Sequence, residues 1–131
     1  MARRSSRSRR SASVTFDTVR QLALALPGVE EGTSYGTPAF KVRGKLFVRL
    51  HQDGDSIVVR IDEKERALRL QADPAAYHIT DHYVGYPWML VRLSAVYLDD
   101  LGDLVEESWR LRAPQRLVTQ YDASQKGKVR P

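Results

Sequence analysis

Cations and aromatic side chains are interleaved in the apolar runs at the middle of the chain. Successive side chains of a strand point to opposite faces, so residues two apart in such a run share a face. Read as strands, these runs present on one face Lys45, Phe47, Arg49, His51, Arg60, Trp88 and Arg92. Cations neutralise phosphates and aromatic rings stack on bases, so this face predicts nucleic-acid binding. The same alternation also suits a plain solvated sheet face, and that alternative stays open.

A second group of cations surrounds Gly44, which lies in a tight turn between two of the runs. These cations would form the basic tip of a hairpin, able to contact phosphates along a groove. A charged turn is also an ordinary way to keep a hairpin soluble. The hypothesis of DNA binding therefore rests on Lys41, Arg43, Lys45, Arg49, Arg60 and Arg92.

Four aromatic residues near glycines indicate a different kind of site. They are Tyr35, beside Gly36, and Tyr83, Tyr86 and Trp88, around Gly85. Aromatic walls and close backbone approach are typical of a small-molecule pocket. The cluster could thus form a non-catalytic module that binds a small ligand or a protein. Equally, these rings could plug the end of the sheet where the loops meet.

Enzyme chemistry has few candidates in this sequence. There is no cysteine, and the three histidines are His51, His78 and His82. His78 and His82 are four apart, but the residues between them suit a strand rather than a helix, so the facing geometry of a zinc motif is not expected. No phosphate-binding glycine loop follows a strand. We expect no metal, no cofactor and no catalytic residue.

The positive charge of the chain lies in its ends. Of 21 basic residues, eight lie at Arg3, Arg4, Arg7, Arg9, Arg10, Lys126, Lys128 and Arg130, which leaves 13 against 16 acidic residues. The folded part is therefore slightly acidic, and totals alone do not predict a basic surface. We expect a disordered Arg/Ser-rich tail at 1–13, one domain at 14–122 and a basic flexible tail at 123–131. No apolar run is long enough to span a bilayer, so the sequence predicts a soluble, cytoplasmic protein without a membrane partner.

A hairpin from Lys45 to Ile61 organises the predicted fold. Two alternating runs flank its Asp53-Gly54 turn, with Leu46, Val48 and Leu50 expected toward the core. Further strands are expected over 38–43, 77–80 and 88–93, and helices over 15–26, 62–72, 101–112 and 115–121. Residues 30–38 read as an irregular lead-in. The order predicts an α+β fold: a twisted antiparallel sheet with helices packed mainly on one face.

Several stretches of the chain resemble the MmcQ/YjbR family. They are Leu26-Pro27-Gly28-Val29-Glu30-Glu31, the run from Tyr35 to Phe47, Tyr83-Val84-Gly85-Tyr86-Pro87-Trp88 and Glu107-Ser108-Trp109. The resemblance covers residues 15–113 and implies a CyaY-like fold and DNA binding through a double-wing arrangement. It supplies no catalytic residues. Trp109 stands where many members have tyrosine, and the arginine-rich arm is not part of the family pattern.

Overall fold

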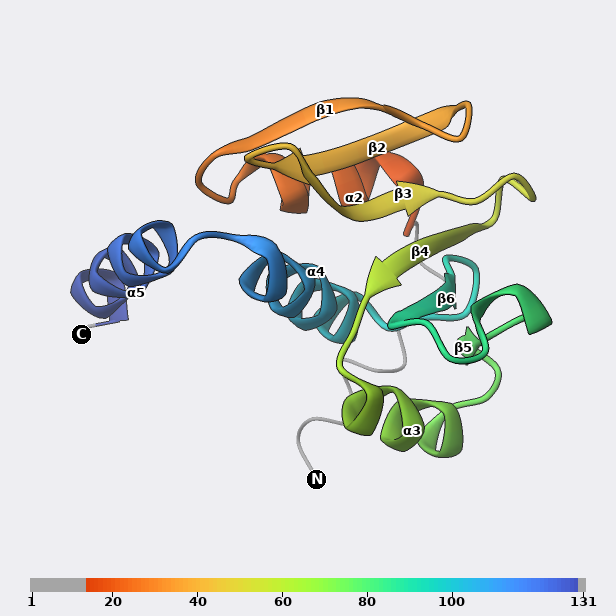
Figure 1. Cartoon of the computed structure of the whole chain (residues 1–131). Coiled ribbons are helices and arrows are strands. Elements are labelled where there is room, and N and C mark those ends of the chain that lie inside the picture. Colours follow the sequence, from red (N-terminus) through yellow and green to blue (C-terminus); the bar gives the residue numbers. More distant parts are fainter. Residues whose placement is uncertain (1–13, 130–131) are drawn as a thin grey trace.

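The computed structural model describes residues 14–129. Six strands form one antiparallel sheet in the order β1-β2-β3-β4-β6-β5 (Figure 1). They are β1 (Val29–Ser34), β2 (Thr37–Val42), β3 (Lys45–Leu50), β4 (Ser56–Arg60), β5 (Tyr77–His78) and β6 (Trp88–Arg92). The first four strands form a meander, and β6 lies between β4 and the edge strand β5. The predicted tail at 1–13 and the last two residues of the predicted tail at 123–131 lie outside the described residues.

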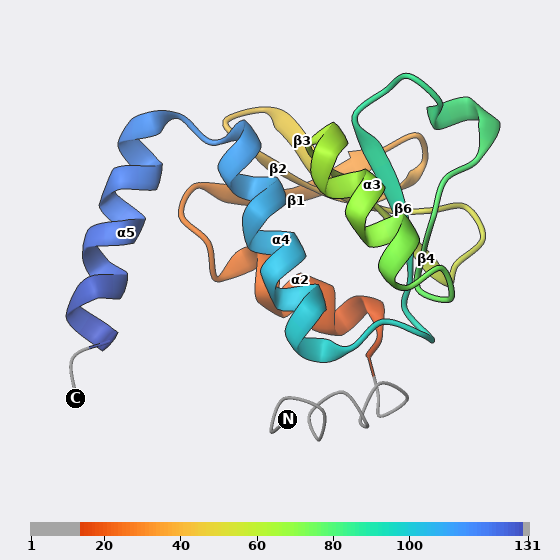
Figure 2. The same cartoon turned by 90° about the horizontal axis from the view of Figure 1, so that it is seen from below.

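The helices lie mainly on one side of this sheet. They are α2 (Phe16–Leu24), α3 (Glu63–Ala72), α4 (Leu98–Arg112) and α5 (Gln115–Val129). Helices α2 and α4 pack side by side beneath the sheet, and α5 extends away from the end of α4 (Figure 2). Helix α3 contacts β5. The predicted α+β class, with helices mainly on one face, is confirmed.

The core lies between the sheet and helices α2 and α4. The strands contribute Phe40, Val48, Ile57, Val59, Met89 and Val91 to it, all fully buried. Trp109 of α4 is also fully buried, and its Nε1–H donates to the carbonyl oxygen of Pro27 at 3.0 Å. This bond ties α4 to the turn that follows α2. The covered face therefore supplies the hydrophobic stabilisation, and the opposite face is free to carry polar groups.

A bulge in β3 changes which side chains face the core. Phe40 lies opposite Val48, but Lys41 lies opposite Leu46, so Phe47 has no partner of its own on β2. Two residues then oppose one, and the alternation is shifted by one position. Phe47 is fully buried in the helix-side core, and the prediction that it lies on the open face is wrong. Leu46 moves to the open face instead.

Three element boundaries also differ from the prediction. Residues 29–34, expected as an irregular lead-in, form the edge strand β1. Four of its six side chains are exposed, so no hydrophobic alternation could mark it. Helix α4 begins at Leu98, after Tyr97 rather than after an aspartate. Helix α5 continues past Tyr121 to Val129, so residues 123–129, expected as a tail, are helical.

Candidate binding site

The open face of the sheet carries a pocket of about 650 Å³. Strands β3, β4 and β6 supply its floor, with Leu46, Arg49, Val58 and Trp88. The loops around it supply Tyr35, His51, Gln52, Thr80, His82, Tyr83 and Tyr86. All four aromatic residues singled out in the sequence therefore line one pocket. Strand register explains this in part, because residues on one face of adjacent strands become neighbours.

The segment between β5 and β6 forms one wall of the pocket. It contains the short 3₁₀ helix η1 (Asp81–Tyr83), and the Tyr83 side chain is buried against Val58 and Leu90 on the open sheet face. This second apolar cluster holds the segment over β4 and β6. The open face is therefore only partly open, contrary to the expected solvated surface.

Arg66 of α3 anchors the same segment from behind. It is 8% exposed, and its Nη1 donates to the carbonyl oxygens of Tyr83, Tyr86 and Trp88 at 3.1, 2.7 and 2.9 Å. A guanidinium that bridges several carbonyls fixes the path of a loop that has little regular secondary structure of its own. The wall of the pocket is thus held in place by a helix outside it. No sequence pattern indicates this role, since Arg66 reads as an ordinary surface residue of a helix.

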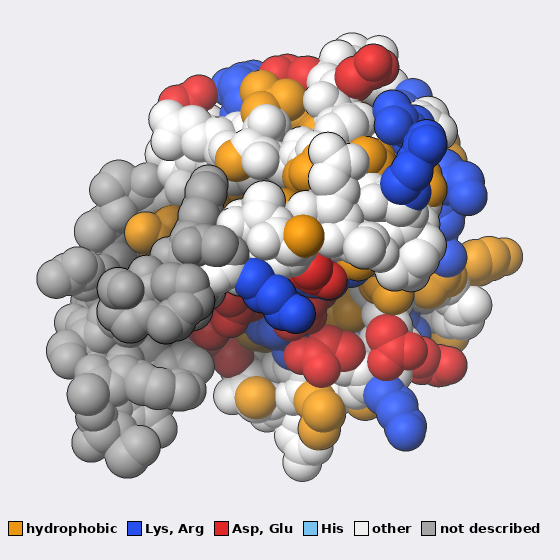
Figure 3. All heavy atoms as spheres, turned by 90° about the vertical axis from the view of Figure 1, so that its left-hand side faces the viewer, with side chains coloured by type: hydrophobic (Ala, Val, Ile, Leu, Met, Phe, Trp, Pro, Cys, Tyr) orange, Lys and Arg blue, Asp and Glu red, His pale blue; other side chains and the backbone are white. Residues whose placement is uncertain are grey.

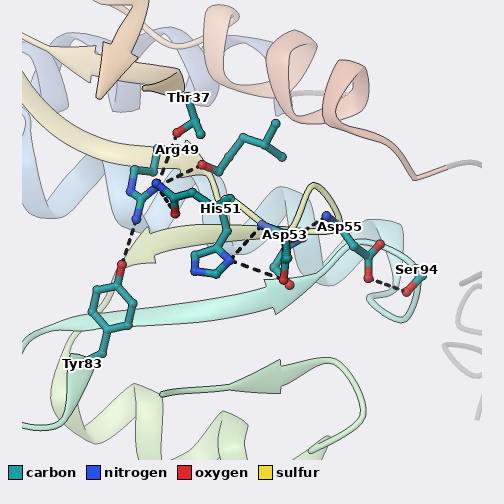
Figure 4. A network of polar contacts seen from close by, with 10 residues as sticks. Thr37, Arg49, His51, Asp53, Asp55, Tyr83 and Ser94 are labelled. Atoms are coloured by element: carbon teal, nitrogen blue, oxygen red, sulfur yellow. Dashed lines mark hydrogen bonds and ion pairs between the residues drawn. The ribbon is translucent and has the colours of Figure 1, made fainter. Parts of the chain in front are cut away.

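Arg49 lies in the pocket but is nearly buried, at 6% exposure. Its Nη2 donates to the hydroxyl of Tyr83 at 3.0 Å (Figure 4). The centroid of the Tyr35 ring lies 5.0 Å from Cζ of Arg49. Its Nη1 donates at 3.4, 3.1 and 3.4 Å to Thr37 Oγ1, Leu50 O and Gln52 Oε1. None of these partners is a carboxylate. The charge is therefore solvated by neutral oxygens and an aromatic ring.

Two of the three histidines line the pocket. His51 places its Nδ1 3.4 Å from Asp53 Oδ2, and His82 packs edge-on against Tyr83. Burial opposes ionisation of Asp53, but the backbone N–H groups of Ser56 and Asp55 donate to its Oδ1 and hold its pKa below the ordinary value. This aspartate therefore stabilises the β3–β4 turn (Figure 4).

The third histidine, His78, lies on β5 outside the pocket. Its buried Nδ1 has no hydrogen-bond partner among the described residues. Burial, and then the charge of Arg92, lower the pKa of His78. Within residues 14–129, no three His, Asp or Glu side chains are grouped to hold a metal ion.

The six cations expected to bind DNA do not form one surface. Arg49 is buried in the pocket, and Arg92 donates to the carbonyl oxygens of Pro74 and Ala75 at 3.3 and 3.0 Å. Arg60 lies over the Trp88 ring, 5.3 Å from its centroid. Arg60 and Arg92 are at opposite ends of the β4–β6 pairing, in which they face Trp88 and Ser56. The sheet-face group is therefore divided among separate environments.

The cations at the β2–β3 turn are close along the chain, but Lys41 pairs with Leu46 of the open face and Lys45 pairs with Val42 of the core side. Lys41 and Lys45 lie on neighbouring strands, and Arg43 lies in the turn with a positive φ of 51°. Burial, and then the charge of Arg112, lower the pKa of Arg60 on β4. On the face drawn in Figure 3, several Lys and Arg side chains lie at the upper right margin, with Asp and Glu side chains both above and below them.

The fold and the site define an α+β domain with helices on one sheet face and an aromatic pocket on the other. Residues 24–111 match the model of the YjbR family. The chain belongs to this family, MmcQ/YjbR, as the resemblance implied. No helix within residues 14–129 has the length and apolar character to cross a membrane.

Curated relatives come from mycobacteria. "Uncharacterized protein Rv2570" of Mycobacterium tuberculosis (strain ATCC 25618 / H37Rv) and "Uncharacterized protein Mb2600" of Mycobacterium bovis are each 39% identical over 72 residues. That segment covers 54% of this chain and 56% of each relative, so the chain spans about half the length of the relatives it matches. These similarities support membership of the family and give no activity.

A solved structure has the same fold. The crystal structure of Deinococcus radiodurans protein DR2400, a DUF419 domain, matches with a TM-score of 0.65 and 24% sequence identity. The match covers 74% of this chain and 77% of that one. At this identity the likeness concerns the fold alone.

Proposed function

We propose that this protein is a binding module that holds a small aromatic ligand in the pocket on the open sheet face. The observation that carries the proposal is the convergence of four aromatic side chains from separate elements on one pocket of about 650 Å³. Pockets of about 300–1,000 Å³ with apolar, aromatic walls are typical ligand sites. The proposal concerns binding and includes no reaction.

Exposed rings at the pocket support this function. Tyr35 is 77% exposed and Tyr86 is 62% exposed, although both line the pocket. A ligand lying between them and Trp88 would remove apolar surface from water, which favours binding. Exposed aromatic side chains at a concave site are also enriched where proteins bind partners.

The two tryptophans allow a direct test. Trp88 lines the pocket, whereas Trp109 is buried in the core with its Nε1–H donated to Pro27. In a ¹H–¹⁵N spectrum the indole signal of Trp88 therefore reports on the pocket, and that of Trp109 serves as an internal reference. With 2-naphthol and 2-naphthamide as probes, we expect the Trp88 signal to shift in a saturable way and the Trp109 signal to stay in place.

A matched pair of variants completes the test. Tyr86→Ala should weaken the binding of the probes several-fold, because it removes one wall. Leu68→Ala is the control, because Leu68 of α3 is 63% exposed and does not line the pocket. Absence of any selective shift of Trp88, or equal effects of the two variants, would contradict the proposal.

DNA binding is the second candidate, favoured by the cations at the β2–β3 turn. Among the described residues, no salt bridge pairs Lys41, Arg43 or Lys45 with a carboxylate. Each phosphate that such cations neutralise steepens the dependence of affinity on salt by about 0.9 in a double-logarithmic plot. The double variant Lys41→Gln, Lys45→Gln should lower that slope for duplex DNA by about 2. An unchanged slope would remove this turn as the DNA contact.

A control for charge alone is available on α3. Lys64→Gln changes an exposed lysine away from the β2–β3 turn and should leave the slope nearly unchanged. A cytoplasmic location stays a prediction from the sequence. It fits either ligand class and does not choose between them.

A further inference from the structure

Arg49 has donors that the protein does not use. A guanidinium carries five N–H groups. The two on Nη1 face Thr37, Leu50 and Gln52, and one on Nη2 donates to Tyr83. The Nε–H and the second N–H of Nη2 have no acceptor among the described residues.

The unused donors lie on Nε and Nη2, the two nitrogens through which a guanidinium can bind an oxyanion side-on. Arg20 shows this mode in the same chain, because its Nε and Nη2 each donate to the Glu31 carboxylate at 3.0 Å. Arg110 also uses its Nε and Nη2, here on Glu106, at 3.0 and 2.9 Å. A planar fork of two N–H donors matches the spacing of the oxygens of a carboxylate or phosphate.

Arg49 also lacks a counter-charge. It is the most buried arginine among the described residues, yet its partners are hydroxyl, amide and carbonyl oxygens. Arg66 is also buried and bonds to carbonyl oxygens, but it does not line the pocket, whereas Arg20, Arg69 and Arg110 are paired with carboxylates. Removing a cation from water without an anion beside it is unfavourable, and a bound anion would offset that cost.

We propose that the ligand of this pocket carries an oxyanion, a carboxylate or a phosphate monoester, that binds the Nε and Nη2 groups of Arg49. The inference rests on the proposed function and adds the chemical class of the ligand. The anion lies at Arg49 beside the Tyr83 hydroxyl, and the ring of the ligand extends along Trp88 and Tyr86. One pocket thus combines a charged anchor with aromatic walls.

Arg49 has a structural role as well, because it joins the β1–β2 hairpin, the β3–β4 turn and the Tyr83 wall. The test therefore starts from the unaltered protein. Three probes share the naphthalene ring and differ in one group: 2-naphthoate, 2-naphthyl phosphate and 2-naphthamide. Titrations follow the Trp88 indole signal at constant ionic strength, with Trp109 as reference.

We expect at least one of the two anions to bind tenfold or more tightly than the neutral amide. The anionic probe that binds more tightly identifies the anion as a carboxylate or a phosphate. If all three probes bind with equal affinity, the proposed pocket stands and the oxyanion inference fails. If no probe moves the Trp88 signal, the proposed function fails, and the inference fails with it.

Variants then assign the preference to Arg49. Arg49→Gln should abolish the preference for the anion, and Arg49→Lys should reduce it several-fold, because lysine keeps the charge but not the fork. Arg49→Lys decides the result if Arg49→Gln does not fold. Lys64→Gln removes an exposed cation of α3 that does not line the pocket and should keep the full preference. An undiminished preference in Arg49→Lys would overturn the assignment.

Discussion

Replacing Arg66 by methionine should open the wall of the pocket without unfolding the domain. Methionine keeps most of the aliphatic packing of the side chain and removes the charged donor. Three carbonyl oxygens, of Tyr83, Tyr86 and Trp88, then lose their common partner. The segment between η1 and β6 keeps its own short-range bonds, one bond from the Ile61 N–H to the carbonyl oxygen of Pro87 at 3.0 Å, and the contacts of Tyr83 with the sheet.

The expected loss of free energy follows from the number of N–H groups on Nη1 of Arg66. A single Nη1 has two N–H groups, so the three contacts amount to about two charge-assisted bonds, each contributing about 1.5–3 kcal/mol. Tyr86 and its neighbours Val84 and Gly85 are exposed, and water can replace part of the lost bonding. We therefore expect a loss near the lower limit, about 3 kcal/mol. That corresponds to roughly a 100-fold higher population of the open segment.

Native-state hydrogen exchange measures this opening residue by residue. The amides of Tyr86 and Trp88, bonded to the oxygens of Tyr83 and Tyr86, should exchange about 100-fold faster in Arg66→Met. The amide of His51, bonded to Ser56 in the β3–β4 hairpin, should change much less. Lys64→Met, an exposed change on the same helix, is the control. Equal acceleration at His51 and Trp88, or none at either, would refute the anchoring role of Arg66.

Two further predictions concern pH and a turn. Burial lowers the pKa of His78 below its ordinary value of 6.5, so the unfolded chain takes up a proton before the folded one, and the free energy of unfolding should fall as pH drops below 6.5. His78→Gln should reduce that fall in urea titrations, and Leu68→Ala, a change of an exposed side chain without an ionisable group, should not. Gly28→Ala should lower the free energy of unfolding more than Gly54→Ala does. At position 54 the only expected cost is that of an alanine in the left-handed conformation, about 1–2 kcal/mol. Gly28 has a φ of +74° and Gly54 a φ of +77°, but only at position 28 would an added Cβ meet Leu117, at 2.8 Å. Equal losses of unfolding free energy in the two variants would show that this contact has no effect.

The elements with strong local signals were predictable. The hairpin from β3 to β4 is marked by alternation and by Asp53-Gly54, and helix α3 by Asp62, whose side chain accepts from the Glu65 amide at 3.4 Å. Strand β1 had no such signal, because its side chains are exposed on both faces. Its place in the sheet comes from backbone pairing with β2, which the side-chain pattern does not record.

The site could be predicted only in part, because a pocket depends on contacts between distant segments. Tyr35, Tyr83, Tyr86 and Trp88 were chosen for their type and neighbouring glycines, and they do line one pocket. The sequence could not show that a loop covers part of the open sheet face. Because the sequence does not show this loop, it also does not show that one cation is buried and that others bind carbonyl oxygens. For this reason a basic face was expected where the structure has a pocket with a single buried cation.

The bulge in β3 links the fold to this pocket. Without it, strict alternation would place Leu46 on the same face as Val48, toward the helices, and Phe47 beside Arg49 on the open face. The extra residue lets Phe47 and Val48 both reach the core, while Leu46 and Arg49 both line the pocket. A phenylalanine at the pocket floor would occupy space that the smaller leucine leaves free. One unpaired residue therefore gives the domain a large core side chain and, two residues later, a cation aimed at the opposite face.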